Sequence, residues 1–261
     1  MSARAPVPPA SIIAASYDGH SAAALAELCG VSHVVVFDEI GSTLDVAHAL
    51  GENGADAGTL VLADAQTAGR GRLGRSWRSE PGAGIWLTLL ERPRHEDTLG
   101  VLALRIALAL APALEPFADN GIRLKWPNDL YVDDAKLAGV LVEARWRGPR
   151  LDWLALGVGI NVRPPAGLGA AGLGPRTSRA DVLRAVVPPL RTAVAMSGQL
   201  TEDEIANFAA RDLAAGRRCD APIPGVVVGI RADGALLVDG NDGRTAILSG
   251  SLVLTSDNSL G

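Results

Sequence analysis

The chain carries the segment Gln66-Thr67-Ala68-Gly69-Arg70-Gly71-Arg72-Leu73-Gly74-Arg75-Ser76-Trp77 directly after an apolar run at 59–63 that favours a strand. Three glycines alternate with three arginines in this segment. Glycine lets the backbone turn tightly and expose its N–H groups, and arginine presents a planar, fixed charge that suits phosphate. We therefore predict a loop that binds a triphosphate, with an indole at its end that can face a base. The alternative is a basic turn exposed to solvent. The regular alternation of glycine and arginine disfavours that alternative.

The same glycines satisfy the dinucleotide pattern G-x-G-x-x-G, through Gly69, Gly71 and Gly74. That pattern indicates a dinucleotide site only where a helix begins directly after the glycines. Pro81 and Gly84 follow too soon for a helix of useful length, and no Gly-Lys-Ser/Thr follows for a P-loop. Both classes of nucleotide-binding protein are therefore disfavoured.

The pattern on both sides of this loop predicts an α/β (α+β) protein. Strands are expected at 33–37, 59–63, 84–90, 122–126, 137–146 and 153–162, and helices at 21–28, 43–50, 99–114, 180–196 and 202–211. Ser42 or Thr43 is placed to cap the second helix, and Trp86 should point to the opposite face of its strand from Ile85 and Leu87. Short β-rich runs at 226–230, 236–238 and 246–248, separated by glycine turns, indicate a small β-barrel. We expect a partly disordered lead at 1–30, a catalytic domain at 31–214 and a barrel at 215–261.

Composition narrows the class of protein. The 261 residues are 48% hydrophobic with a net charge of −5, which is typical of a globular protein and argues against a broad nucleic-acid surface. The longest apolar stretch, 101–114, is interrupted by Arg105 and Pro112 and is too short to span a membrane. Two distant cysteines, Cys29 and Cys219, and the lack of an export signal favour the cytoplasm.

Two further segments contain residues suited to an anion site. The first is Lys125-Trp126-Pro127-Asn128-Asp129, followed after a hairpin tip at Asp133-Asp134 by Lys136-Leu137-Ala138-Gly139. These lysines could face phosphates, or could be ordinary surface lysines. The second is Gly157-Val158-Gly159-Ile160-Asn161-Val162, whose glycines allow close approach either by a ligand or by a packed helix.

Taken in order and spacing, these segments resemble the biotin–protein ligase family, the biotin–[acetyl-CoA-carboxylase] ligases and holocarboxylase synthetases. Gly41-Ser42-Thr43 and the turn Ser249-Gly250 extend the resemblance to roughly residues 35–255. The resemblance implies a mixed sheet flanked by helices and a C-terminal SH3-like barrel. It also implies that biotin and ATP form biotinyl-5′-AMP with Mg²⁺, and that biotin then passes to a lysine of the biotin carboxyl carrier domain of a carboxylase.

The family pattern also implies site residues. Catalysis would fall to Arg70, Lys125 and Lys136. Biotin would contact Ser42, Thr43, Gln66, Arg70, Trp86, Lys136 and Gly139. ATP and the adenylate would contact Gly69, Arg70, Gly71, Arg72, Gly74, Arg75, Trp77, Asn128, Asp129 and Asn161, with Asn128 and Asp129 also near Mg²⁺. Trp77 would stack on adenine, and the loop would close over the adenylate.

The chain departs from the family pattern at two places. Leu44 stands where the family usually has a polar residue or methionine after Ser42-Thr43. About thirty residues precede the first core strand, so we expect no separate DNA-binding domain, no nucleic-acid partner and no repressor function. We expect no membrane partner, and either a monomer or a homodimer. The alternatives are a non-catalytic biotin sensor, a ligase for a related acyl cofactor such as lipoate and, least favoured, a nicotinamide oxidoreductase.

Overall fold

The centre of the protein is a mixed sheet of eight strands, seen in a computed structural model that describes residues 12–93, 95–165, 167 and 169–255. The strands lie in the order β1-β2-β3-β4-β8-β7-β6-β5, and all neighbours are antiparallel except β2 and β3. Their bounds are β1 (Ile12–Ile13), β2 (His33–Ile40), β3 (Thr59–Gln66), β4 (Gly84–Glu91), β5 (Ile122–Lys125), β6 (Asp129–Val132), β7 (Ala135–Arg147) and β8 (Arg150–Asn161). The expected mixed sheet is confirmed.

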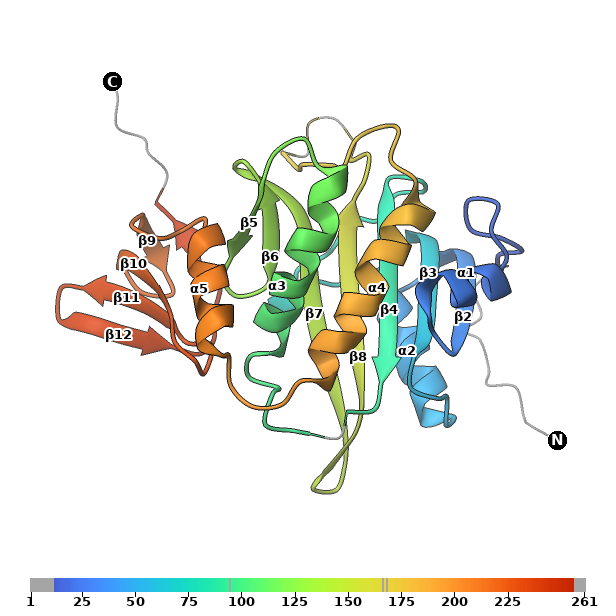
Figure 1. The fold of residues 1–261 in the computed structure, drawn as a ribbon, viewed down its shortest axis with the longest axis horizontal. Coiled ribbons are helices and arrows are strands. Elements are labelled where there is room, and N and C mark those ends of the chain that lie inside the picture. The colour runs from blue at the N-terminus through green and yellow to red at the C-terminus, as the bar shows by residue number, and fades with distance from the viewer. Residues whose placement is uncertain (1–11, 94, 166, 168, 256–261) are drawn as a thin grey trace.

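Helices cover both faces of this sheet (Figure 1). One face carries α1 (Ala22–Cys29), α3 (Leu102–Leu114) and α4 (Arg179–Ala195), and the other carries α2 (Thr43–Glu52). β4 shows the two-sided burial expected from its alternation, because Ile85 and Leu87 face the three-helix side and Thr88 donates a hydrogen bond to Thr43 on α2. Ser42 caps α2 by accepting a hydrogen bond from the backbone N–H of Leu44, as expected. No helix in the described residues is long and apolar enough to cross a membrane.

Residues 12–29 fall within the expected lead and are packed against the sheet. β1 pairs with β2, and the Ser21 side chain caps α1. Arg179 at the start of α4 forms ion pairs with Asp18 and Asp64 and lies 4.3 Å over the ring of Tyr17. The remainder of the lead, residues 1–11, lies outside the described residues.

The C-terminal part is a smaller antiparallel sheet of five strands, in the order β12-β11-β10-β9-β13. Its strands are β9 (Arg218–Ala221), β10 (Gly225–Ile230), β11 (Leu236–Gly240), β12 (Gly243–Ile247) and β13 (Val253–Leu254). α5 (Glu202–Arg211) precedes it and contacts α3 and β10. The indole Nε1 of Trp126 donates to the carbonyl of Gly234 at 2.9 Å, which attaches this sheet to the turn after β5.

Candidate active site

A pocket of about 260 Å³ opens on the α2 side of the large sheet. Its floor is made by β7 and β8, and its walls by the start of α2, the glycine–arginine loop (67–78), the turn 126–128 and residues 251–252. Lys125 and Lys136 are the two lysines of the entire sequence, and both line this pocket. A chain that uses arginine for its other fixed positive charges thus places both of its lysines at one site.

The glycine–arginine loop is a hairpin held by backbone hydrogen bonds. Its base joins Gln66 N to Ser79 O at 3.0 Å, and the next rungs join Trp77 N to Gly69 O at 2.8 Å and Gly71 N to Arg75 O at 2.7 Å. A Cβ at Gly69 would overlap the carbonyl oxygen of Trp77, so this rung needs glycine. The hairpin leads into β4 with no α-helix in the described segment 67–83, which agrees with the rejection of a dinucleotide-binding turn.

Glycines on the floor accommodate the indole of Trp77. Gly139 on β7 and Gly159 on β8 are directly opposite each other in the ladder. A Cβ at Gly159 would lie 2.5 Å from the Trp77 ring, and one at Gly139 would lie 3.1 Å from it. Gly157, two residues earlier on the same face, packs under Leu44. The loop therefore approaches β8 closely at Gly159 and α2 approaches it at Gly157, and both glycines also line the pocket.

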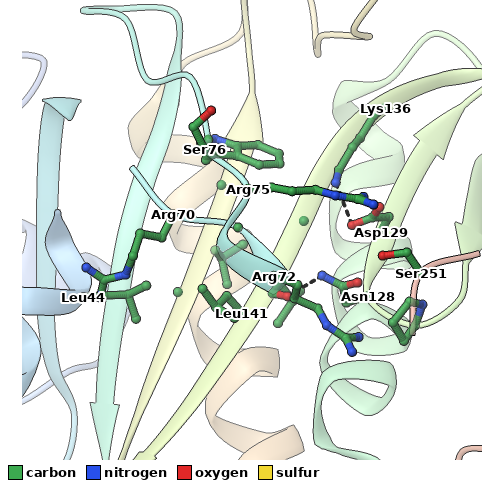
Figure 2. A pocket seen from close by; sticks show the side chains of 18 of the residues that line it. Leu44, Arg70, Arg72, Arg75, Ser76, Asn128, Asp129, Lys136, Leu141 and Ser251 are labelled. Carbon is green, nitrogen blue, oxygen red and sulfur yellow. Dashed lines mark hydrogen bonds and ion pairs between the residues drawn. The ribbon is translucent and has the colours of Figure 1, made fainter. Parts of the chain in front are cut away.

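Positive side chains gather at one end of the pocket around a single carboxylate. The Nζ atom of Lys136 lies 2.8 Å from Asp129 Oδ1 and 5.0 Å from the centre of the Trp77 ring. Figure 2 shows Arg75 reaching from the loop toward this pair. Burial lowers the pKa of Lys125, and the nearby charge of Asp129 only partly opposes this. An anionic ligand would therefore be attracted to this end, and would stabilise the charged form of Lys125.

The opposite end of the pocket is lined by polar groups that are hydrogen-bonded to other protein groups. The Oε1 atom of Gln66 accepts hydrogen bonds from the backbone N–H of Thr43 at 2.9 Å and from its hydroxyl at 3.1 Å. The Nε2 atom of Gln66 donates to the Ser79 hydroxyl at 2.8 Å, and the hydroxyl of Thr88 donates to that of Thr43. These bonds fix the start of α2 to the base of the loop, so this end of the pocket is rigid.

Comparison with known proteins shows to which family a chain with this pocket belongs. The family model for the Biotin/lipoate A/B protein ligase family matches residues 36–161, which include the loop, both lysines and the paired glycines. A biotin–[acetyl-CoA-carboxylase] ligase of Paracoccus denitrificans is 34% identical over 215 residues, which cover 74% of this chain and 89% of that protein. The chain belongs to the biotin–protein ligase family.

Solved structures and longer relatives agree with this family. A biotin protein ligase from Aquifex aeolicus, solved in complex with biotin and ATP, is 29% identical with a TM-score of 0.69, over 85% of this chain and 98% of that one. The bifunctional ligase/repressor BirA of Bacillus spizizenii is 41% identical over 131 residues, which are 50% of this chain and 40% of that protein. The present chain therefore matches less than half the length of this bifunctional member.

The pocket brings together most of the residues that the family pattern implies. Its lining includes Ser42, Thr43, Gln66, Arg70, Gly71, Arg72, Arg75, Trp77, Lys125, Asn128, Asp129, Lys136 and Gly139. Gly69 and Gly74 shape the loop without lining the pocket. Asn161 also lies outside the lining, where its Nδ2 donates to the carbonyl of Lys136 at 3.1 Å and so positions that lysine's backbone.

Trp86 is placed differently from the expected pocket wall. It is not among the lining residues; it lies behind Trp77, with ring centres 6.4 Å apart, and its Nε1 donates to the carbonyl of Asp64. The apolar lining comes instead partly from Leu44 and Leu141. Leu141 follows Gly139 by two residues on the same face of β7, so strand alternation could have identified it.

The residues expected near a metal suit an ion that is held mainly by phosphates. In the described residues no group of three or more His, Cys, Asp or Glu side chains could enclose a metal. Asn128 donates its Nδ2 to the carbonyl of Val140 at 2.6 Å, which leaves its Oδ1 as an acceptor beside the carboxylate of Asp129. Mg²⁺ commonly takes one or two protein oxygens together with substrate phosphates, and this donor set fits that habit.

Proposed function

We propose that the chain is an ATP-dependent biotin–protein ligase, which forms biotinyl-5′-AMP and transfers biotin to a lysine of a biotin carboxyl carrier domain. The observation that supports the proposal most strongly is a single pocket whose two ends differ in charge and polarity. Lys136, Lys125 and Arg75 make one end suited to phosphates, and Thr43 and Leu44 make the other suited to a small, partly apolar ring.

The first half-reaction needs two anions to meet. A biotin carboxylate oxygen bonds to the α-phosphorus of ATP while the bond to pyrophosphate breaks. Repulsion between two unit charges at about 4 Å is about 4 kcal/mol at an effective dielectric constant of about 20. The ammonium of Lys136 and the loop arginines offset this repulsion, and bound Mg²⁺ would add positive charge on the phosphates beside Asp129 and Asn128.

The second half-reaction needs an intermediate that is kept from water. The neutral amine of the carrier lysine bonds to the acyl carbon, the bond to the phosphate oxygen breaks, AMP leaves, and the amine's proton passes to solvent. No protein nucleophile is required, so positioning and charge carry the catalysis. The loop hairpin, with Trp77 at its end, supplies a cover for the adenylate and a face for adenine.

Biotin-dependent exchange of labelled pyrophosphate into ATP tests this function, with lipoate as the competing acid and a purified carrier domain as the acceptor. We expect exchange with biotin and none with lipoate, followed by a label on the carrier. Biotin binding without exchange would instead support a sensor, and exchange with lipoate a lipoate ligase.

The proposed function also implies a partner protein and a cellular compartment. The carrier domain of a biotin-dependent carboxylase is the proposed partner, and we propose the cytoplasm because both cysteines are buried free thiols. We propose that the chain is a monomer or a homodimer, and we predict that it has no repressor function. Retention of an operator DNA fragment by the full chain would contradict it.

Gly159→Ala tests the glycine floor. The new Cβ would lie 2.5 Å from the rigid indole of Trp77, so the ring and the loop must shift. We expect the KM for ATP in the exchange assay to rise about tenfold or more, because small displacements of a binding group are costly. Gly121→Ala is the matched control, since a Cβ there meets nothing within 4 Å. Equal KM values for the two variants would show that Trp77 does not meet the nucleotide.

A further inference from the structure

Arg70, the first arginine of the loop, is held by two carboxylates from different elements. Its Nη1 lies 2.6 Å from Asp45 Oδ1 on α2, and its Nη2 lies 3.5 Å from Glu143 Oε2 on β7. Figure 2 shows Arg70 on the far side of the pocket from Lys136. Arg70 lines both the pocket and a neighbouring hollow, and so forms part of the wall between them. Because 73 residues separate Arg70 from Glu143, this contact depends on the fold.

Glu143 is itself oriented from behind by a histidine. His48 Nε2 lies 2.8 Å from Glu143 Oε2, and Trp153 Nε1 donates to His48 Nδ1 at 3.1 Å. Since Nδ1 accepts a hydrogen bond, the proton of the neutral ring is assigned to Nε2, where it faces the carboxylate. The hydrogen bond from His48, together with the charge of Arg70, lowers the pKa of Glu143 against the effect of burial. Glu143 is therefore an ionised acceptor with a fixed donor on one side.

The far end of this chain of contacts is rigid. Trp153 is 2% exposed, and the guanidinium groups of Arg92 and Arg145 lie 5.6 and 5.8 Å from the centre of its ring. Gly51 on α2 lies against the indole so closely that a Cβ there would be 2.7 Å from it. The indole therefore fixes His48, His48 fixes Glu143, and Glu143 faces Arg70.

We propose that Glu143, oriented by His48, is a positioning residue that works with Asp45 to hold the Arg70 guanidinium at the edge of the pocket before substrate binds. This inference rests on the proposed function and on the contact between Arg70 and biotin that the family pattern implies. A guanidinium that is already placed loses less freedom when an anion binds than a freely rotating one. Glu143 should therefore act on the binding of biotin rather than on the chemical step, and should also fasten the loop that carries Arg70.

Glu143→Gln tests the proposal in the pyrophosphate exchange assay. Glutamine keeps the shape of the side chain and an acceptor for His48, but it lacks the charge that holds Arg70. We expect the KM for biotin to rise about tenfold with kcat changed less than about twofold, as for coupled residues in contact. Glu52→Gln is the matched control, because Glu52 lines the same hollow and, among the residues that the structure describes, forms an ion pair with the more exposed Arg145 at 3.4 Å.

A cycle with Arg70→Ala separates positioning from general destabilisation. If Glu143 acts through Arg70, Glu143→Gln should raise the KM for biotin no further in the Arg70→Ala background. An unchanged or lowered KM in the single variant, or an undiminished effect in the double variant, would overturn the proposal.

A second measurement does not depend on turnover. Leu73 at the tip of the loop is 70% exposed, so trypsin can reach the bond after Arg72 in the ligand-free chain. We expect faster cleavage there in Glu143→Gln and not in Glu52→Gln. Faster cleavage in a protein that shows no biotin-dependent exchange would support the role of Glu143 while contradicting the proposed ligase function. Equal cleavage rates in all three proteins would count against the role of Glu143.

Discussion

Replacing Lys136 with alanine is expected to lower kcat for biotin-dependent pyrophosphate exchange by about 100- to 1,000-fold. The lysine projects from β7, pairs with Asp129 at 2.8 Å and lies over Trp77, so its ammonium is aimed into the pocket before substrate arrives. Charge builds on the phosphate oxygens as the carboxylate attacks, and the loss of one preorganised donor at such a site costs about 2.7–4 kcal/mol. The alanine variant would also leave Asp129 as an uncompensated negative charge beside the phosphates.

Two comparisons make this prediction specific. Lys136→Arg keeps the charge on a longer, planar group, and we expect a smaller loss than in the alanine variant. Arg150→Ala removes a positive charge from an exposed position on the β7–β8 hairpin, and it should leave kcat unchanged. If Lys136→Ala keeps more than about a third of the wild-type kcat, electrostatic stabilisation by this lysine is not part of the mechanism.

The parts of the site that local chemistry determines could be predicted from sequence. Alternating glycine and arginine after an apolar run predicted the loop, because glycine permits the tight turns and close backbone approach that the hairpin shows. Two-residue periodicity on β4 correctly separated Ile85 and Leu87 from Thr88. A cap of α2 by Ser42 or Thr43 was predicted from the hydrogen-bonding of short hydroxyl side chains, and the structure shows that Ser42 is the cap.

Other parts depend on which strands become neighbours, and sequence patterns do not contain that information. β8 lies between β4 and β7, and this order brings Gly159 opposite Gly139. The ion pairs of Arg70 join the loop to α2 and β7, and Ser251 reaches the pocket from the C-terminal sheet. The place of Trp86 outside the pocket lining has the same origin, since the ring that lines the pocket is that of Trp77, which packs edge-to-face on Trp86.

The apolar stretch 101–114 contains a buried arginine. We expect its replacement to lower the free energy of unfolding more than the replacement of an exposed charged residue would. Arg105 on α3 is 2% exposed, and its Nε donates to Glu204 Oε1 at 2.7 Å while its Nη2 donates to the carbonyl of Gln199 at 2.8 Å. Burial opposes ionisation of Glu204, but hydrogen bonds from Arg105 and from the backbone of Thr201 outweigh it and lower the pKa of that carboxyl. The ion pair therefore joins α3 to the first turn of α5, next to the C-terminal sheet.

Arg105→Ala should lower the free energy of unfolding by about 3–5 kcal/mol at pH 7, because it leaves Glu204 charged and without its buried partner. Urea titration would show this loss as a lower midpoint. Arg184→Ala is the control, because it removes an exposed ion pair with Asp181 and should change the free energy of unfolding by less than about 0.5 kcal/mol. A carboxyl with a lowered folded-state pKa adds stability above its unfolded pKa of about 4.3 and loses it as the pH falls through the folded value. The difference in the free energy of unfolding between wild type and Arg105→Ala should therefore become smaller below about pH 4. A difference that stays constant there would show that the variant is destabilised by lost packing and not by lost charge.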